Sequence, residues 1–122
     1  MKVEDLDVLR PEPSYVRMGG KDIDVSFIPC GITFEIDALV QQLQPLVPEI
    51  NKGNIDAVRK GFELSVKMCA VFCAYKYPEM DEKWFKDNTD IRQIQLFAQA
   101  IRGALEKAYN TGSASGGGDP KN

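Results

Sequence analysis

The feature that most constrains the fold is a long amphipathic helical pattern over residues 55–77, which Pro78 ends. Apolar side chains recur in it at steps of three and four residues, the spacing of one helix face. Further apolar residues, among them Leu64 and Tyr75, widen that face. A helix that is apolar over so much of its circumference has to be covered on more than one side. It is therefore predicted to be the central helix of the core.

Three further helical patterns flank this one, at about residues 34–44, 82–87 and 90–109. Each has a plausible capping residue at its start. Thr33 is predicted to cap the first helix and Asp81 the second. Asp90 and Gln93 have the spacing of a capping box at the start of the last helix.

A β-hairpin is predicted over residues 15–28. Its second strand alternates between apolar and polar residues, with Ile23, Val25 and Phe27 on one face. Gly19 and Gly20 separate the two strands, and glycine readily adopts the positive φ of a hairpin turn. A two-stranded hairpin alone is only marginally stable in water. It is therefore expected to pack on the helices or to pair with another chain.

These elements predict one domain in a chain of 122 residues. The expected fold class is mainly α, or α+β by strict count, with an N-terminal hairpin followed by a three- to four-helix domain. The domain is expected to span residues 14–109. Residues 1–13, acidic and ending in a pair of prolines, are predicted to be a flexible arm. Residues 110–122, rich in Gly and Ser, are predicted to be a disordered tail.

Composition excludes several function classes. The formal net charge is −3, so nothing favours binding to nucleic acid or to an anionic membrane surface. No run approaches the roughly 20 apolar residues of a membrane span, and residues 1–13 lack the apolar core of a signal peptide, so neither is expected. The chain contains no His, the commonest general base and metal ligand. A cytoplasmic protein without enzymatic activity is therefore expected, with no catalytic residue and no cofactor.

The cysteines are the nearest approach to a metal site. Cys69 and Cys73 lie one helical turn apart, a spacing that could supply half of a zinc site. Cys30 is the third cysteine, and no His is available as a fourth ligand. The ligand count therefore favours Cys69 and Cys73 as small core residues with free thiols, and no metal is expected.

Two other motifs have structural explanations. Gly19-Gly20-Lys21 lacks the spacing of a phosphate-binding loop, so a hairpin turn is the better interpretation. The acidic residues between Glu79 and Glu82 lie at a helix start, where negative charge is favourable, and they do not follow the pattern of a calcium loop.

Apolar side chains that could bind a partner are the remaining candidates for a functional site. Trp84 and Phe85 are adjacent on a one-turn helix and cannot both face the same core, so one can be a core residue and the other can contact a partner. For Trp84 a core role is favoured over a partner contact. Together with the wide face of the long helix, they suggest a binding surface. The candidate partner-binding residues are Phe62, Val66, Tyr75, Tyr77, Trp84 and Phe85.

Residues 75–95, YKYPEMDEKWFKDNTDIRQIQ, resemble the C-terminal half of the phage tail assembly chaperones. These are small proteins of long-tailed phages that are encoded next to the tape measure protein. The turn MGGK at residues 18–21, followed by DIDVSF, is similar to the N-terminal part of the family. The resemblance covers residues 14–109. The leading arm departs from the shortest members, which begin almost at the hairpin.

The resemblance implies a non-enzymatic chaperone, encoded by a phage or prophage, in the cytoplasm of the bacterial host. Such a protein binds the tape measure protein, keeps it soluble, helps to recruit tail tube subunits and is absent from the mature virion. It implies the tape measure protein and the tail tube protein as partners, together with self-association. Many members also have a longer product made by frameshifting. The alternative is a structural tail or head–tail connector subunit that is retained in the particle.

Overall fold

The hairpin forms around its two glycines, but it is shorter than expected. The structure, a computed structural model, describes residues 2–114, with side chains described as far as Tyr109. Strands β1 (Tyr15–Met18) and β2 (Lys21–Asp24) are antiparallel. Gly19 and Gly20 both have positive φ, 59° and 77°, as a type I′ turn requires.

The expected second strand, which reached residue 28, was too long. The Asp24 carboxylate accepts hydrogen bonds from the backbone N–H and the hydroxyl of Ser26, at 2.9 and 2.6 Å. This side-chain turn bends the chain out of the sheet. Val25 still donates to the carbonyl oxygen of Ser14 and is buried, so the pairing continues for one further residue beyond the assigned strand.

Helix α1 (Cys30–Leu43) begins earlier than expected, and its N-cap is Pro29 rather than Thr33. Pro29 has an extended backbone, and its carbonyl accepts the Thr33 N–H at 2.9 Å. The Thr33 hydroxyl donates to the same carbonyl at 3.3 Å. The prediction of a Thr33 cap was wrong because the extended proline already supplies the first acceptor of the helix.

The two prolines after α1 redirect the chain without abolishing helical structure. A short 3₁₀ turn, η2 (Gln44–Leu46), contains Pro45, and the short helix α2 (Val47–Asn51) contains Pro48. Each proline lies in the first turn of its element, where a missing N–H costs little. Gly53, at a φ of 82°, then reverses the chain into the long helix.

The long helix α3 (Ile55–Ala74) is capped by Asn54, whose side chain accepts the N–H of Ala57 at 3.2 Å. It ends at Ala74, earlier than the expected residue 77. The N–H of Tyr77 closes back onto the carbonyl of Cys73 at 2.7 Å. Pro78 disfavours helical backbone at Tyr77, which explains the earlier end.

The last two helices begin at the predicted caps. Asp81 caps α4 (Glu82–Asn88) by accepting the Trp84 N–H at 2.9 Å. Asp90 and Gln93 form the predicted reciprocal capping box before α5 (Ile91–Ala114), with bonds of 2.9 and 2.8 Å. Helix α5 includes residues 110–114, which were assigned to the disordered tail. No proline interrupts the sequence there. The rest of that predicted tail, residues 115–122, lies outside the described residues.

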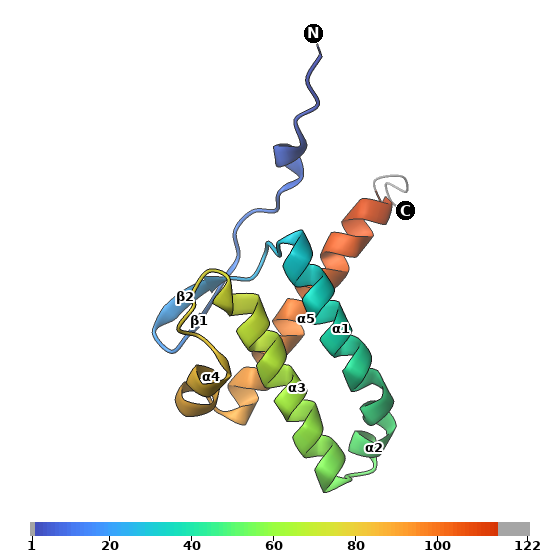
Figure 1. Cartoon of the computed structure of the whole chain (residues 1–122). Coiled ribbons are helices and arrows are strands. Elements are labelled where there is room, and N and C mark those ends of the chain that lie inside the picture. The colour runs from blue at the N-terminus through green and yellow to red at the C-terminus, as the bar shows by residue number, and fades with distance from the viewer. Residues whose placement is uncertain (1, 115–122) are drawn as a thin grey trace.

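The molecule is mainly α-helical, as expected, and α3 is its centre (Figure 1). Helix α3 packs against α1 and α5, and also against α2 and α4. Phe97 of α5 meets Phe72 of α3 edge to face at 5.8 Å and stacks on Phe85 of α4 at 6.2 Å. The hairpin adds Met18 and Ile23 to the same core. Helix α1 adds Ile36, so four helices and the hairpin share one apolar interior.

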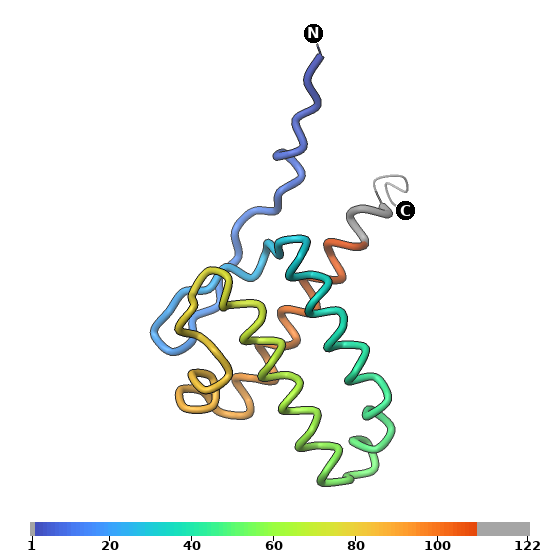
Figure 2. The backbone as a smooth tube through the Cα atoms, viewed as in Figure 1, coloured from blue at the N-terminus to red at the C-terminus, as the bar shows by residue number. Residues whose placement is uncertain are grey.

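The N-terminal arm, residues 2–13, leaves this body and extends away from it (Figure 2). It contains one short 3₁₀ turn, η1 (Leu6–Leu9), capped by the Asp5 side chain. Arg10 attaches the arm by placing its guanidinium over the Phe27 ring, 3.8 Å from the ring centroid. Apolar side chains of the arm are exposed, among them Leu6 and Leu9. Whether the arm is flexible stays a prediction.

Candidate partner-binding groove

An apolar groove runs between the N-terminal half of α3, helix α4 and the start of α5. It includes a shallow hollow of about 440 Å³. Its floor and walls are apolar side chains from all three helices: Ile55, Val58, Phe62, Val66, Phe85, Ile91 and Ile94. These residues are called the groove below. Its volume is within the range of ligand-binding clefts.

The groove has a buried floor and an exposed rim. Phe85, Ile94 and Val66 are 0, 4 and 7% exposed, so they form the floor and also belong to the core. Ile55 and Ile91, by contrast, are 72 and 59% exposed. Two large aliphatic side chains facing solvent beside an apolar hollow are typical of a partner site.

The local sequence explains why these side chains converge. Ile55, Phe62 and Val66 follow the three- and four-residue steps of one face of α3. The break between α4 and α5 brings the second wall close, because the Thr89 hydroxyl donates to the carbonyl of Phe85. The capping box then starts α5 directly at Ile91.

Four charged side chains also line the groove, and both carboxylates among them are engaged within the molecule. Glu63 pairs with Lys86 at 2.9 Å and thereby links α3 to α4. The hydrogen bond to Glu63 raises the pKa of Lys86. Asp90 accepts the N–H of Gln93 and pairs with Arg92, which together hold the pKa of its carboxyl below the usual range.

Arg59 is the fourth charged side chain of the groove, and it is the least engaged. Its nearest carboxylate, that of Asp56, is 3.9 Å away, and both side chains are largely exposed. Such a pair contributes little to stability. Arg59 is therefore available to form an ion pair with a carboxylate of a partner.

The six candidate residues divide between two places. Phe62, Val66 and Phe85 line the groove. Phe85 is fully buried, so it shapes the floor and presents no surface of its own. Tyr75, Tyr77 and Trp84 lie elsewhere. Tyr75 is 44% exposed at the end of α3, where burial raises its pKa and the charges of Lys76 and Arg10 partly oppose that shift.

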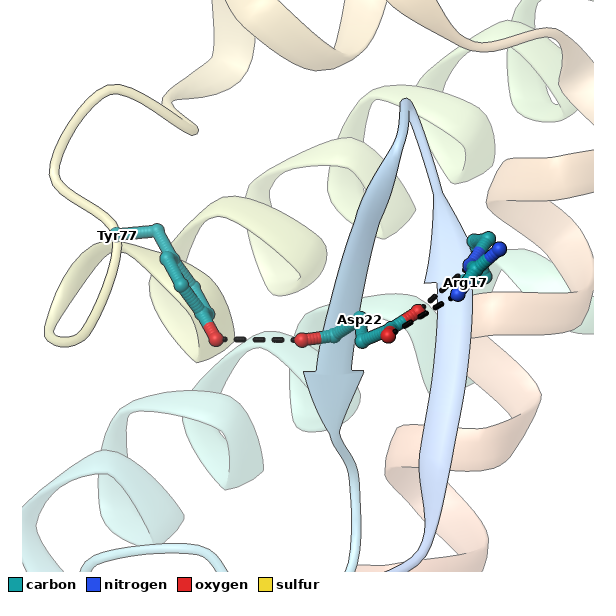
Figure 3. Close-up of polar contacts among 3 residues, drawn as sticks. All are labelled: Arg17, Asp22 and Tyr77. Atoms are coloured by element: carbon teal, nitrogen blue, oxygen red, sulfur yellow. Dashed lines mark hydrogen bonds and ion pairs between the residues drawn. The ribbon is translucent and has the colours of Figure 1, made fainter.

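Tyr77 and Trp84 attach the hairpin to the helices. The Tyr77 hydroxyl donates to the backbone carbonyl of Asp22 at 3.2 Å, while the Asp22 carboxylate pairs with Arg17 at 2.7 Å (Figure 3). Lys21 pairs with Glu79 at 2.8 Å beside them. These contacts fulfil the expectation that the hairpin packs on the helices.

Trp84 lies directly under the hairpin turn. A Cβ atom on Gly19 would come within 2.4 Å of the Trp84 ring. Glycine at this position therefore allows the turn to lie on the indole as well as to adopt positive φ. Half-buried Trp84 thus packs against the hairpin turn, and its neighbour Phe85 is a core residue.

Four groove residues were missing from the sequence-based candidates: Ile55, Val58, Ile91 and Ile94. All four lie on the apolar stripes that were expected to face the core. Ile55 and Ile91 differ from the core residues in one way that the sequence shows. Each is the first residue of a helix, directly after a cap. A residue there lies at the end of the core face, where neighbouring helices do not reach it.

The buried thiols belong to the core and not to a site. Cys69 and Cys73 are buried and Cys30 is exposed, and all three thiols are free. Burial raises the pKa of Cys69 and Cys73, for Cys73 to about 12. Thiols of this kind are poor nucleophiles and poor metal ligands at neutral pH. Over residues 2–114, no three His, Cys, Asp or Glu side chains are grouped to hold a metal.

Comparison with family models, curated proteins and solved structures gives no match for this chain. Within the described part of the chain, no helix has both the length and the apolar character needed to cross a membrane.

Proposed function

We propose that this protein is a non-enzymatic binding protein whose groove receives an amphipathic helix. The observation that carries the proposal is the pair of exposed aliphatic side chains, Ile55 and Ile91, on either side of an apolar floor. An amphipathic helix in an apolar groove is a common recognition mode and uses anchors one helical turn apart.

The resemblance to phage tail assembly chaperones supplies the identity of the client. The helix would belong to a tape measure protein, which the chain keeps soluble in the bacterial cytoplasm until tail tube subunits polymerise. The arrangement supports such a role, because the groove is open and shallow and can release its client. Retention in the particle as a tail or connector subunit is the alternative to be distinguished.

The proposal predicts a long helical reading frame next to this gene, and its test is co-expression of the two proteins. The wild-type chain should keep that protein soluble and co-purify with it. Ile55→Asp and Ile91→Asp should each weaken capture by about tenfold or more, because each places a charge in the apolar contact. Leu96→Asp is the matched control, since Leu96 is 66% exposed on α5 and is not a groove residue.

Equal capture by the groove variants and the control would contradict the groove as the client site. Mass spectrometry of purified virions distinguishes the alternative, because a chaperone should be missing from the particle and a connector subunit should be present.

A further inference from the structure

The arm carries apolar side chains that its own domain does not cover. Leu6 and Leu9 are 67 and 65% exposed. They are three residues apart in the 3₁₀ turn η1, a spacing that places both on the same side of the turn. The Asp5 cap holds this turn in a helical conformation, which lowers the entropy cost of docking it. The arm therefore presents a preformed pair of apolar anchors.

The charge of the arm complements the one poorly engaged charge of the groove. Residues 3–9, VEDLDVL, contain three carboxylates and no cation. The groove offers Arg59, while its own carboxylates, on Glu63 and Asp90, are paired within the molecule. An acidic segment with two apolar anchors therefore fits an apolar groove that has a spare cation.

The arm cannot place this turn in the groove of its own chain while Arg10 remains on Phe27. Arg10 is also close enough to Tyr75, at the far end of α3, to act on its phenol electrostatically. Leu9 is adjacent to Arg10, and Leu6 can extend at most about 14 Å from it. Phe62 lies about 20 Å back along the helix, and Ile55 about 30 Å. Figure 1 shows the arm and the start of α3 at opposite ends of the molecule.

We propose that the groove receives the Leu6–Leu9 turn from the arm of a second copy of this chain. Each copy then gives one arm and offers one groove. Two copies that exchange arms form a closed dimer, and copies that do not exchange arms reciprocally form larger rings or open chains. The arm and a client helix compete for the same groove. This proposal is independent of the client, because self-association is measured with the protein alone.

Sedimentation velocity at tens of micromolar tests the proposal. Wild type should sediment as a dimer or a larger species. The arm variant, Leu6→Ser with Leu9→Ser, and the groove variant, Ile55→Ser with Ile91→Ser, should each be monomeric, with association weakened by about tenfold or more per anchor. All four positions are exposed, so circular dichroism should show both variants folded. Leu96→Ser should behave as wild type.

Mixing the two variants is the decisive measurement. An intact arm on one variant and an intact groove on the other should give a 1:1 heterodimer that cannot grow. Self-association of the arm variant alone would overturn the proposal, because it would show that copies meet without their arms. A monomeric wild type would overturn it as well.

Charge reversal provides an independent check. Arg59→Glu should weaken association, and adding Glu4→Lys and Asp7→Lys in the same chain should restore it. Glu12→Lys is the matched control, since Glu12 lies outside the docking segment, and it should not restore association. Rescue by Glu12→Lys, or no effect of Arg59→Glu, would contradict the predicted placement of the arm.

Discussion

At the scale of the residue, single contacts attach the hairpin to the helices. Gly19 lies against Trp84, and the Tyr77 hydroxyl bonds to the backbone of β2. Because a two-stranded hairpin is marginal alone, these contacts determine whether it stays folded. Tyr77 and Trp84, two of the aromatic residues that suggested a partner surface, therefore hold the hairpin in place. The exposed apolar surface beside the groove lies instead at Ile55 and Ile91.

Gly19→Ala should lower the free energy of unfolding more than Gly20→Ala does. Both changes place alanine at positive φ, which costs about 1 kcal/mol or more. Gly20 has open space for a Cβ atom, whereas Gly19 meets the Trp84 ring. The overlap should add about 1–3 kcal/mol. Urea unfolding of both variants measures the difference.

The same two glycine changes in a Trp84→Ala background are the control. The extra cost at Gly19 should then disappear, because the ring that it meets is gone. A difference between the two glycines that persists without the indole would contradict the close-packing explanation.

At the scale of the element, caps set where each helix starts and thereby place the groove. The Asp90 box starts α5 only three residues after α4 ends. This short break holds Ile91 opposite Ile55. The position of the α5 wall therefore depends on the Asp90 and Gln93 capping box, which can be recognised in the sequence. The distance between the two walls depends on how α4 packs on α3.

Stability should fall at acid pH partly through the Asp90 cap. Its pKa is lowered in the folded protein, chiefly by the backbone N–H of Gln93. The contribution of the ionised Asp90 side chain to the free energy of unfolding is therefore complete above the ordinary aspartate pKa of about 3.9. It is lost as the pH falls through the lower folded value, where the carboxylate is protonated. Urea midpoints between about pH 6 and pH 2 should show this loss in the wild type.

Asp90→Asn isolates the effect, because an Asn side chain still accepts the capping N–H and does not titrate. The acid-dependent loss of stability should be smaller in this variant than in wild type. Identical pH profiles for the two proteins would show that the cap does not contribute to the titration.

At the scale of the whole molecule, α3 is covered unevenly. Helices α1, α2 and α5 pack along it and the hairpin lies over its C-terminal end, whereas one face of its N-terminal half opens into the groove (Figure 1). The arm and the groove are therefore two exposed apolar features of one small domain. Covering one with the other, between copies, would remove both from water.

Deleting residues 2–9 should leave the stability of the dilute monomer within about 0.5 kcal/mol of wild type, as for other exposed positions. The side chains of this segment are exposed and Arg10, which contacts Phe27, is retained. Phe97→Ala is the contrasting variant. It removes the ring between Phe72 and Phe85 and should cost about 3–5 kcal/mol.

Urea unfolding at low protein concentration measures both variants. A large loss of stability on deleting the arm would show that it packs on its own domain, which would contradict the exposure on which the proposed arm exchange rests.

The sequence by itself determined the hairpin and the four main helices, but not the short elements η1, η2 and α2. Helical periodicity identified α3 as the central helix, the Gly-Gly pair identified the hairpin turn, and capping residues marked the starts of α4 and α5. These features are local, because spacing, φ preference and a side-chain hydrogen bond all act within a few residues. Local competition also explains the errors, since Pro29 displaced the expected Thr33 cap and the Asp24 turn shortened β2.

Only the tertiary structure decided which apolar residues are covered. Ile55 and Ile91 have the same periodicity as core residues, yet both are exposed. For Trp84 the sequence left a core role and a partner contact open, and its packing under the hairpin turn decides for an internal role. Burial depends on which neighbour reaches a side chain, and that neighbour is distant in the sequence. The groove exists because α4 and the start of α5 leave one face of the first turns of α3 uncovered, a result of packing that no local pattern encodes.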